Sequence, residues 1–289
     1  MKCIPMARGF GALIEGVQLS GDLDSETMTD LLFRLYRHRF LVIPDQDFDP
    51  GGYIAFARRI GRPITFFDPG QRDHQWPEII LISNSAATIE ENRDFALHWH
   101  TDGSYEDPPA SVTMLYGVEA PAEGNETLFC DMVAAYDALD PAVKAAIEDL
   151  VVIHGKGDQR LLLAGEKRGR ADVPPIAIVH HRLVGRHPVT GEQMLYATAG
   201  SARGIVGMGD DEALQLLSQL KVHATQERFV AAGAARTRGV LIWDNYAVLH
   251  SATPTRYSDE DGERRRVYRI STRDIPLSAE LFSTASAAA

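Results

Sequence analysis

Cysteines and long apolar runs are scarce in this sequence. Only Cys3 and Cys130 occur among its 289 residues, which argues against a disulfide framework and a cysteine-rich zinc site and favours a reducing compartment. No stretch approaches the roughly 18 consecutive apolar residues of a membrane span. Residues 1–9 also lack the apolar core of a signal peptide. We therefore expect a cytoplasmic protein that does not enter a membrane.

Basic residues are scarce relative to acidic ones. The chain has 29 Lys and Arg against 40 Asp and Glu, a formal net charge of -11. Nucleic-acid-binding proteins use a basic electrostatic field, so we expect no DNA or RNA partner. Hydrophobic residues make up 45% of the chain, which is ordinary for a globular core. Because no repeat, low-complexity tract or linker interrupts the sequence, we expect residues 1–289 to form a single domain.

Apolar spacing and turn residues predict both helices and short strands. Helices are expected beginning near residue 24, at about 50–60, at 132–139, at 141–150 and from 210 to about 230. Strands are expected at 40–43, 78–83, 111–118, 126–130, 176–179, 194–198, 239–249 and 265–272. The polar, aperiodic residues 156–175 predict a long loop of the kind that often forms a lid. This arrangement predicts an α+β chain whose core is a β-sandwich or jelly roll.

The densest group of metal-ligand side chains lies at residues 98–102, which include His98, His100 and Asp102. In a β-strand these three positions would point to one face. Two histidines and one carboxylate form the facial triad that holds non-haem Fe(II) and leaves coordination positions open. His250, at the end of the apolar segment 240–250, is the candidate for the remaining ligand. Spacing alone leaves open whether His98 or His100 accompanies Asp102.

Four blocks of sequence occur in a characteristic order. They are Trp99-His100-Thr101-Asp102, residues 124–139, Trp243-Asp244-Asn245 followed by His250, and residues 265–269. In these blocks the chain resembles the Fe(II)/2-oxoglutarate-dependent dioxygenases of the taurine dioxygenase and chlorophenoxyacetate dioxygenase type. The resemblance implies a double-stranded β-helix (jelly roll) core with flanking helices. It also selects His100, Asp102 and His250 as the metal ligands and makes His98 a pocket residue.

The resemblance further implies a site for the cosubstrate 2-oxoglutarate. This dianion has a remote C5 carboxylate, which a guanidinium binds best through two charge-assisted hydrogen bonds. By resemblance Arg265 binds this carboxylate, Arg269 follows on the same strand face, and Thr127 supplies a hydroxyl. A slip of one residue in the strand would exchange Arg265 for Arg266, so the choice between them stays open.

The reaction implied by the resemblance uses Fe(II), 2-oxoglutarate and O2 to oxidise a C–H bond of a small-molecule substrate, most simply by hydroxylation. Succinate and CO2 are the coproducts. Taurine-specific members carry a His and a Tyr after the second helix, whereas this chain has Phe66 and Phe67. We therefore expect an anionic organic substrate with an apolar body rather than taurine. The candidate substrate contacts are His98, Phe66, Phe67 and Arg269.

Two other functions fit the same ligand residues. The first is a jelly-roll protein that binds a metal without catalysis, and the second is a zinc-dependent hydrolase. The open triad and the two spaced arginines speak against the first, and activity with Zn(II) without O2 would identify the second. Because relatives are often dimers or tetramers, a homodimer or homotetramer is expected.

Overall fold

The computed structural model describes residues 1–6, 9–66, 68–87, 96–156, 160–163, 166 and 178–275. Helices and β-sheets are mixed along the chain, as the α+β prediction requires. Phe67 and most of the predicted lid loop at 156–175 lie outside the described residues. No helix in the described part of the chain is long and apolar enough to cross a lipid bilayer.

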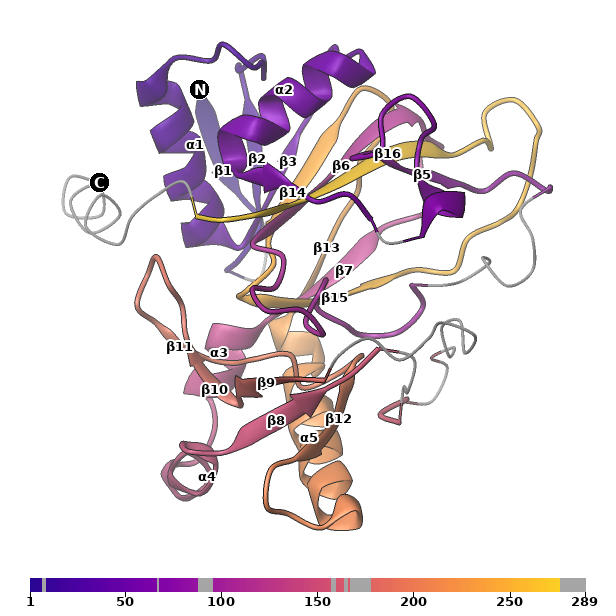
Figure 1. The fold of residues 1–289 in the computed structure, drawn as a ribbon. Helices are drawn as coiled ribbons and strands as arrows, with labels where there is room; N and C mark the ends of the chain where they lie inside the picture. The colour runs from indigo at the N-terminus through magenta and orange to yellow at the C-terminus, as the bar shows by residue number, and fades with distance from the viewer. Residues whose placement is uncertain are drawn as a thin grey trace.

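The largest sheet has eight strands and contains the first and last strands of the described chain (Figure 1). Its strands are β1 Lys2–Pro5, β2 Ala12–Glu15, β3 Phe40–Ile43, β4 Arg62–Pro63, β5 Ile80–Ser83, β6 Val112–Glu119, β14 Val240–Asp244 and β16 Arg266–Arg273. The spatial order is β1-β2-β3-β14-β6-β16-β4, and β5 also pairs with β16. Only β2 and β3 are parallel neighbours. Strands β14 and β16 flank β6 at the centre, and β16 carries the predicted site residue Arg269.

Two helices cover one side of this sheet (Figure 1). They are α1 Ser25–His38 and α2 Pro50–Ile60, and both lie where the sequence predicts them. Each is capped by an aspartate, Asp24 or Asp49, whose carboxylate accepts a backbone N–H of the first turn. The apolar faces pack on the sheet through residues that include Leu31, Leu35, Ile54, Ile60, Met114 and Ile242.

A second, three-stranded sheet faces the large one. Its strands, in the order β13-β7-β15, are β7 Thr127–Asp131, β13 Val230–Gly233 and β15 Val248–Ala252. Phe129 on β7 is fully buried, with its ring 4.4 Å from the Phe40 ring and 5.5 Å from the Trp243 ring. Because Phe40 and Trp243 belong to the large sheet, the two sheets share an apolar core.

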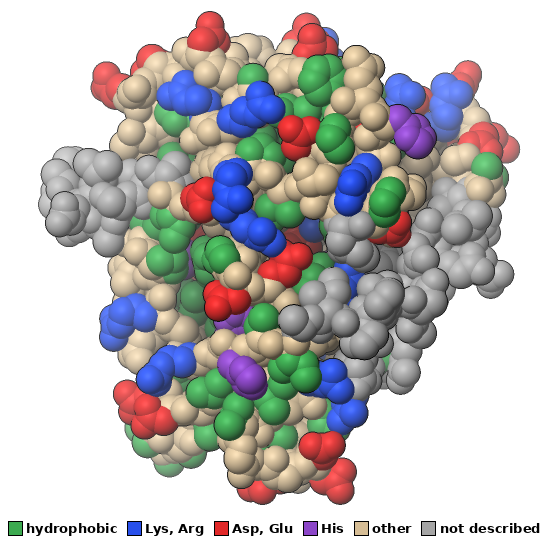
Figure 2. Space-filling view, in the orientation of Figure 1, with side chains coloured by type: hydrophobic (Ala, Val, Ile, Leu, Met, Phe, Trp, Pro, Cys, Tyr) green, Lys and Arg blue, Asp and Glu red, His purple; other side chains and the backbone are tan. Residues whose placement is uncertain are grey.

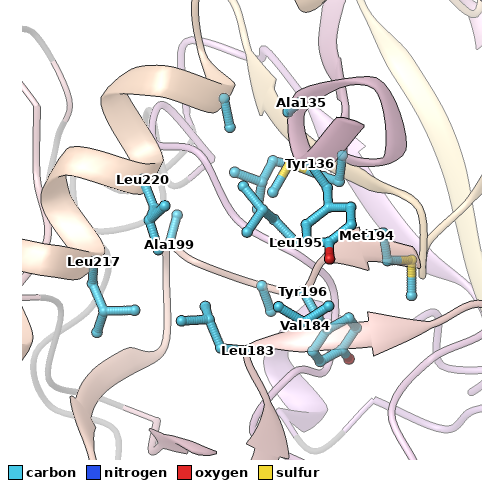
Figure 3. Packing of buried hydrophobic residues seen from close by; sticks show 14 of the residues in the cluster. Ala135, Tyr136, Leu183, Val184, Met194, Leu195, Tyr196, Ala199, Leu217 and Leu220 are labelled. Carbon is cyan, nitrogen blue, oxygen red and sulfur yellow. The ribbon is translucent and has the colours of Figure 1, made fainter. Parts of the chain in front are cut away.

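The remaining elements form a separate layer, in the lower half of Figure 1. They are a three-stranded sheet of β8 Val151–His154, β9 Val179–Arg182 and β12 Ala202–Ile205, the hairpin of β10 Val184–Arg186 and β11 Gln193–Leu195, and the helices α3 Met132–Asp137, α4 Pro141–Ile147 and α5 Asp210–Ala224. In the described residues two 3-10 turns occur: η3 Glu227–Phe229 lies beside α3 in this layer, and η1 Pro69–Gln71 lies beside β5 of the large sheet. Figure 3 shows side chains from α3, α5 and the hairpin gathered in one apolar cluster.

The prediction of one strand at 239–249 is wrong, because the chain forms two strands, β14 and β15, in different sheets. Asp244 makes the turn between them. Its carboxylate accepts the N–H of Tyr246 and its carbonyl accepts the N–H of Ala247. Such side-chain to backbone bonds favour turns. The turn moves the chain to the second sheet and thereby places His250 opposite the large sheet.

Several other boundaries differ from the prediction by a few residues. The helix expected to reach about residue 230 ends at Ala224, because Thr225 caps it by donating its hydroxyl to the Lys221 carbonyl. The strand expected at 194–198 is β11, which spans Gln193–Leu195 and pairs with β10. Of the strand expected at 176–179, residues 176 and 177 lie outside the described residues, and Val179 begins β9. His187 turns the hairpin, since its Nδ1 accepts two following backbone N–H groups.

Candidate metal centre

Three metal-ligand side chains, His100, Asp102 and His250, meet in one place. Their candidate ligand atoms all lie within 4.8 Å of one another. Nε2 of His100 is 3.7 Å from Oδ1 of Asp102, and Nε2 of His250 is 3.5 Å from Oδ2. In the described residues this is the one group of three or more His, Cys, Asp or Glu side chains arranged to hold a metal ion. Two nitrogens and one oxygen fit Fe(II) and leave coordination positions for other ligands.

The backbone that carries His100 and Asp102 is a loop with a single bridge residue, His100, so the strand geometry considered for positions 98, 100 and 102 does not apply. His100 and His250 exchange one pair of backbone hydrogen bonds, of 2.9 and 2.8 Å. Beyond this pair, the backbone groups of Asp102 bond to the side chain of Asn245 instead of to another strand. Its Oδ1 accepts the Asp102 N–H and its Nδ2 donates to the Asp102 carbonyl. Asn245 therefore fixes the backbone of one candidate ligand to the β14–β15 turn.

The imidazole of His100 is in the form that binds a metal. Its Nδ1 lies 2.8 Å from the carbonyl oxygen of His98, which can only accept, so Nδ1 carries the proton and Nε2 keeps its lone pair. Burial lowers the pKa of His100 well below its ordinary value, and the neighbouring His250 and His98 lower it further. The ring is therefore neutral at physiological pH.

The carboxylate of Asp102 is held by two further side chains. Arg269 Nη2 is 2.6 Å from Oδ1, and the Thr113 hydroxyl donates to Oδ2 at 2.8 Å. Ser271 joins them, with its hydroxyl 2.8 Å from that of Thr113 and 3.3 Å from Arg269 Nη2. Burial opposes the charge of Asp102, but Arg269 and the two histidines outweigh it and hold the pKa of the carboxyl well below its ordinary value. The carboxylate is thus ionised and oriented.

Replacing Thr113 with valine should weaken Fe(II) binding about 10- to 100-fold, the usual cost of losing a hydrogen-bond partner of a metal ligand. Valine has nearly the same shape, so the loss comes from the freed carboxylate oxygen. Calorimetric titration of the metal-free protein with Fe(II) under anaerobic conditions measures the effect. Thr113→Ser, which keeps the hydroxyl, is the matched control. Equal affinities in the valine and serine variants would show that the hydroxyl does not orient Asp102.

A glycine makes room for the other ligand of the loop. Gly200 has a φ of +66°, and a Cβ built on it would lie 2.8 Å from the Cβ of His100 and 3.2 Å from its Cα. Both the positive φ and the close approach require glycine. Any side chain at position 200 would displace His100 or the segment packed on it.

A buried ion pair holds the segment between His98 and His100. Glu166 accepts the backbone N–H of Trp99 at 2.7 Å, and its other oxygen lies 2.6 Å from Nζ of Lys221 on α5. The Lys221 side chain is only 1% exposed and also donates to the Leu161 carbonyl. Burial lowers the pKa of Lys221, while Glu166 opposes this shift. Removing either partner would leave a buried, uncompensated charge beside the metal centre.

The candidate metal centre opens into a cavity of about 230 Å³ between the two sheets. Its walls come from both sheets and include Ile80, Ile82, Leu115, Thr127, Trp243 and Ala252. Because these elements are far apart in the sequence, the cavity exists only in the folded chain. It is large enough for small organic molecules beside the metal centre.

Arg265 lines this cavity, whereas its neighbour Arg266 is exposed. The backbone before β16 is held in this register by Asn84, whose Oδ1 accepts the Arg265 N–H at 2.6 Å. Burial lowers the pKa of Arg265 to about 10. Within the described residues no carboxylate lies within 4 Å of its guanidinium. A buried cation of this kind is stabilised by an anionic ligand.

Most of the other predicted site residues also lie at the cavity. Thr127, Arg269, His98 and Phe66 all line the same cavity, and Phe67 lies outside the described residues. The His98 ring is 4.7 Å from the His100 ring, and burial lowers its pKa to about 4. His98 is therefore a neutral wall residue, and its ligand-type side chain is not part of the cluster that could hold the metal.

Sequence reasoning assigned no role to four residues that contact or line the site. They are Thr113, Asn245, Tyr105 and Lys156. Two of them could have been noticed in the sequence. Thr113 places a hydroxyl in a strand of mostly apolar residues, and Asn245 belongs to the block Trp243-Asp244-Asn245. Tyr105 and Lys156 follow no pattern, since only folding brings them to the cavity.

Comparison with known proteins gives three concordant results. A family model described as "Taurine catabolism dioxygenase TauD, TfdA family" matches residues 3–271. The chain is 30% identical over 283 residues to the alpha-ketoglutarate-dependent 2,4-dichlorophenoxyacetate dioxygenase of Cupriavidus pinatubonensis, covering 93% of this chain and 96% of the relative. It is 32% identical over 270 residues to the (S)-phenoxypropionate/alpha-ketoglutarate-dioxygenase of Sphingobium herbicidovorans, covering 86% and 88%. The solved structure of a taurine dioxygenase from Burkholderia xenovorans is similar with a TM-score of 0.77 at 27% identity, covering 96% of this chain and 91% of that one.

Proposed function

Since the chain belongs to the TauD/TfdA family and is a 2-oxoglutarate-dependent non-haem iron dioxygenase, we propose that it hydroxylates a small anionic substrate with an apolar body. One observation carries the proposal. A single cavity combines the His100, Asp102 and His250 cluster with a buried, carboxylate-free guanidinium and with aromatic walls. Family membership also sets aside the two alternative hypotheses, a non-catalytic metal-binding protein and a zinc hydrolase.

The enzymes of this family use Fe(II), 2-oxoglutarate and O2. We propose that His100, Asp102 and His250 hold the iron, because their donor atoms are close together, His100 is neutral and Asp102 is ionised. When bound, the iron and 2-oxoglutarate supply the oxidising chemistry, with succinate and CO2 as coproducts. The protein itself orients the three ligands, binds 2-oxoglutarate and the substrate, and excludes water from the cavity.

For the cosubstrate we propose Arg265 and Thr127 as the partners of the C5 carboxylate. Both line the cavity that contains the candidate metal centre; Thr127 begins β7, and Arg265 directly precedes β16 of the facing sheet. The guanidinium of Arg265 is buried and has no carboxylate partner among the described residues. A dianion bound there would neutralise it through charge-assisted hydrogen bonds.

For the substrate we propose a carboxylate or sulfonate attached to an apolar body. The rings of Phe66 and Tyr105 line the cavity and suit an apolar group. The cations that line the cavity favour an anion. Two relatives are named for 2,4-dichlorophenoxyacetate and (S)-phenoxypropionate, which are both carboxylates on an aromatic ether. These names support the same substrate class here.

Several expectations about the whole molecule remain proposals. We propose that the two facing sheets form a double-stranded β-helix and that residues 1–289 act as one catalytic domain. Figure 2 shows acidic and basic side chains interspersed on one face, which supports a small molecule rather than a nucleic acid as partner. A homodimer or homotetramer and a cytoplasmic location are the corresponding predictions for assembly and compartment.

Succinate release from the purified, Fe(II)-loaded enzyme tests the proposed function. Phenoxyacetate, phenylmethanesulfonate and related aromatic acids should stimulate conversion of 2-oxoglutarate to succinate, whereas taurine should not. Mass spectrometry should find one added oxygen atom in the organic product or in a fragment formed from it. Equal stimulation by uncharged analogues of the same acids, or none by any acid, would contradict the proposed substrate class.

A further inference from the structure

His187 connects the β10–β11 hairpin to the turn between β14 and β15. Its side chain is fully buried, and its Nε2 lies 3.2 Å from Oδ1 and 3.0 Å from Oδ2 of Asp244. Asp244 is the last residue of β14, and its side chain is fully buried as well. The two residues are 57 positions apart in the sequence, so only the fold brings them into contact.

The second ring nitrogen of His187 determines where its proton lies. Nδ1 accepts the backbone N–H groups of Val189 and Thr190, at 3.2 and 3.0 Å, so it carries no proton itself. The proton is therefore on Nε2, which donates it to the Asp244 carboxylate. A hydrogen bond to a carboxylate is charge-assisted and stronger than one between neutral groups. Both ring nitrogens thus have a defined partner, one in the hairpin and one in the turn.

The hairpin gives His187 a rigid support. Val184 and Leu195, from its two strands, belong to the apolar cluster that also contains side chains of α3 and α5 (Figure 3). His187 directly follows β10. Its ring also packs against the rings of Tyr36 and Tyr246, at centroid distances of 5.5 and 6.0 Å. The imidazole therefore has little freedom to move.

The turn that contains Asp244 leads to two candidate metal ligands. The next residue, Asn245, bonds to the Asp102 backbone through both polar atoms of its side chain, at 3.0 and 2.9 Å. Strand β15, which carries His250, begins three residues after Asn245. Oδ1 of Asp244 also accepts the Tyr246 N–H at 3.2 Å. A shift of the Asp244 side chain would therefore move the turn and, with it, both ligands.

We therefore propose that His187 is a positioning residue of the metal centre, which acts through Asp244 to fix the turn that places Asp102 and His250. This inference rests on the proposed function and deepens it, because it concerns the same three iron ligands. His187 does not line the cavity, so it reaches the metal centre only through Asp244 and Asn245. Its loss should weaken Fe(II) binding and leave the 2-oxoglutarate site at Arg265 unchanged.

Two variants of His187 separate the partners of its two ring nitrogens. His187→Asn places an oxygen near the position of Nδ1 and should keep the hairpin turn, but its side chain is too short to reach Asp244. His187→Gln places an N–H near the position of Nε2 and keeps that contact. Anaerobic calorimetric titration with Fe(II) should find the affinity about 10-fold lower in His187→Asn, as for loss of an outer partner of a metal ligand. The affinity in His187→Gln should remain close to that of the unaltered protein.

The matched control is His223→Gln. His223 lies on α5 in the same layer, and its Nε2 donates to the Ala135 carbonyl at 2.8 Å, away from the turn. This variant should bind Fe(II) normally even where its melting temperature falls. At saturating Fe(II), KM for 2-oxoglutarate should be unchanged in all three variants. Normal Fe(II) affinity in folded His187→Asn, or losses in all three variants that follow their melting temperatures, would overturn the inference.

Asp244→Asn tests the same contact from the other side if His187→Asn does not fold. Oδ1 accepts the N–H groups of Tyr246 and His187, and Oδ2 lies 3.0 Å from Nε2 of His187. In either orientation the new amide therefore places its NH2 group against a donor. Fe(II) affinity should again fall about 10-fold, and an unchanged affinity in the folded variant would contradict the inference.

Failure of the proposed function gives a different result. If the unaltered protein showed no charge-transfer band with Fe(II) and 2-oxoglutarate under anaerobic conditions, the proposed iron site would be wrong, and the inference would be wrong with it. A normal band in the unaltered protein, together with normal Fe(II) affinity in His187→Asn, would contradict the inference alone.

Discussion

Replacing Asp102 with alanine should lower substrate-dependent succinate formation by more than about 100-fold, which exceeds the usual cost of losing an outer contact of a metal ligand. The carboxylate lies between the two imidazoles and is the oxygen donor of the cluster. Its removal also leaves the Arg269 guanidinium, now 2.6 Å from Oδ1, facing two imidazoles without a counter-charge. Both effects disfavour a bound cation. Succinate assays at saturating Fe(II), together with an Fe(II) titration, measure the loss.

Two further variants make this result interpretable. Asp102→Asn keeps the shape of the side chain and an oxygen for the Thr113 hydroxyl, so it should fold, yet it should also lose most activity. Asp107→Ala removes an exposed carboxylate from the same loop and should retain activity. Circular dichroism reports whether each variant is folded. Near-normal turnover in a folded Asp102→Ala variant would rule out the proposed triad.

Replacing Arg265 with methionine should raise the dissociation constant of 2-oxoglutarate about 100-fold, the cost expected when one partner of a buried charge pair is truncated. The guanidinium lies in the cavity, burial lowers its pKa to about 10, and no described carboxylate neutralises it. A bound C5 carboxylate would therefore be its main counter-charge. Anaerobic titration of the Fe(II)-loaded protein with 2-oxoglutarate, followed by the charge-transfer absorption band, measures the constant.

Arg266→Met is the matched control for Arg265, since the two residues are adjacent but Arg266 is exposed. It should leave the dissociation constant within about twofold, because exposed charges contribute little. The affinity for Fe(II) should be unchanged in both variants. If Arg266→Met weakened 2-oxoglutarate binding and Arg265→Met did not, the strand register would place Arg266, and not Arg265, on the C5 carboxylate.

The elements that could be predicted from the sequence are those set by local interactions. Helices α1 and α2 begin at the aspartates that cap them, and their apolar residues recur at helical spacing. The apolar run at 239–249 predicts one strand, because its period does not reveal that the Asp244 side chain turns the backbone. Short strands such as β12 Ala202–Ile205 were missed because four residues of mixed polarity carry no period.

By itself the sequence determined which chemical groups are available: two histidines and an aspartate as donors, and arginines spaced on one strand face. Residue spacing left open which of them meet, and the tertiary structure decided it. It places His100 rather than His98 with Asp102 and His250, and Arg265 rather than Arg266 in the cavity. The reason is physical. The type of each residue fixes the chemistry of its side chain. Which distant residues lie close together depends instead on tertiary contacts, such as those between Asn245 and the Asp102 backbone, which form only when the sheets pack.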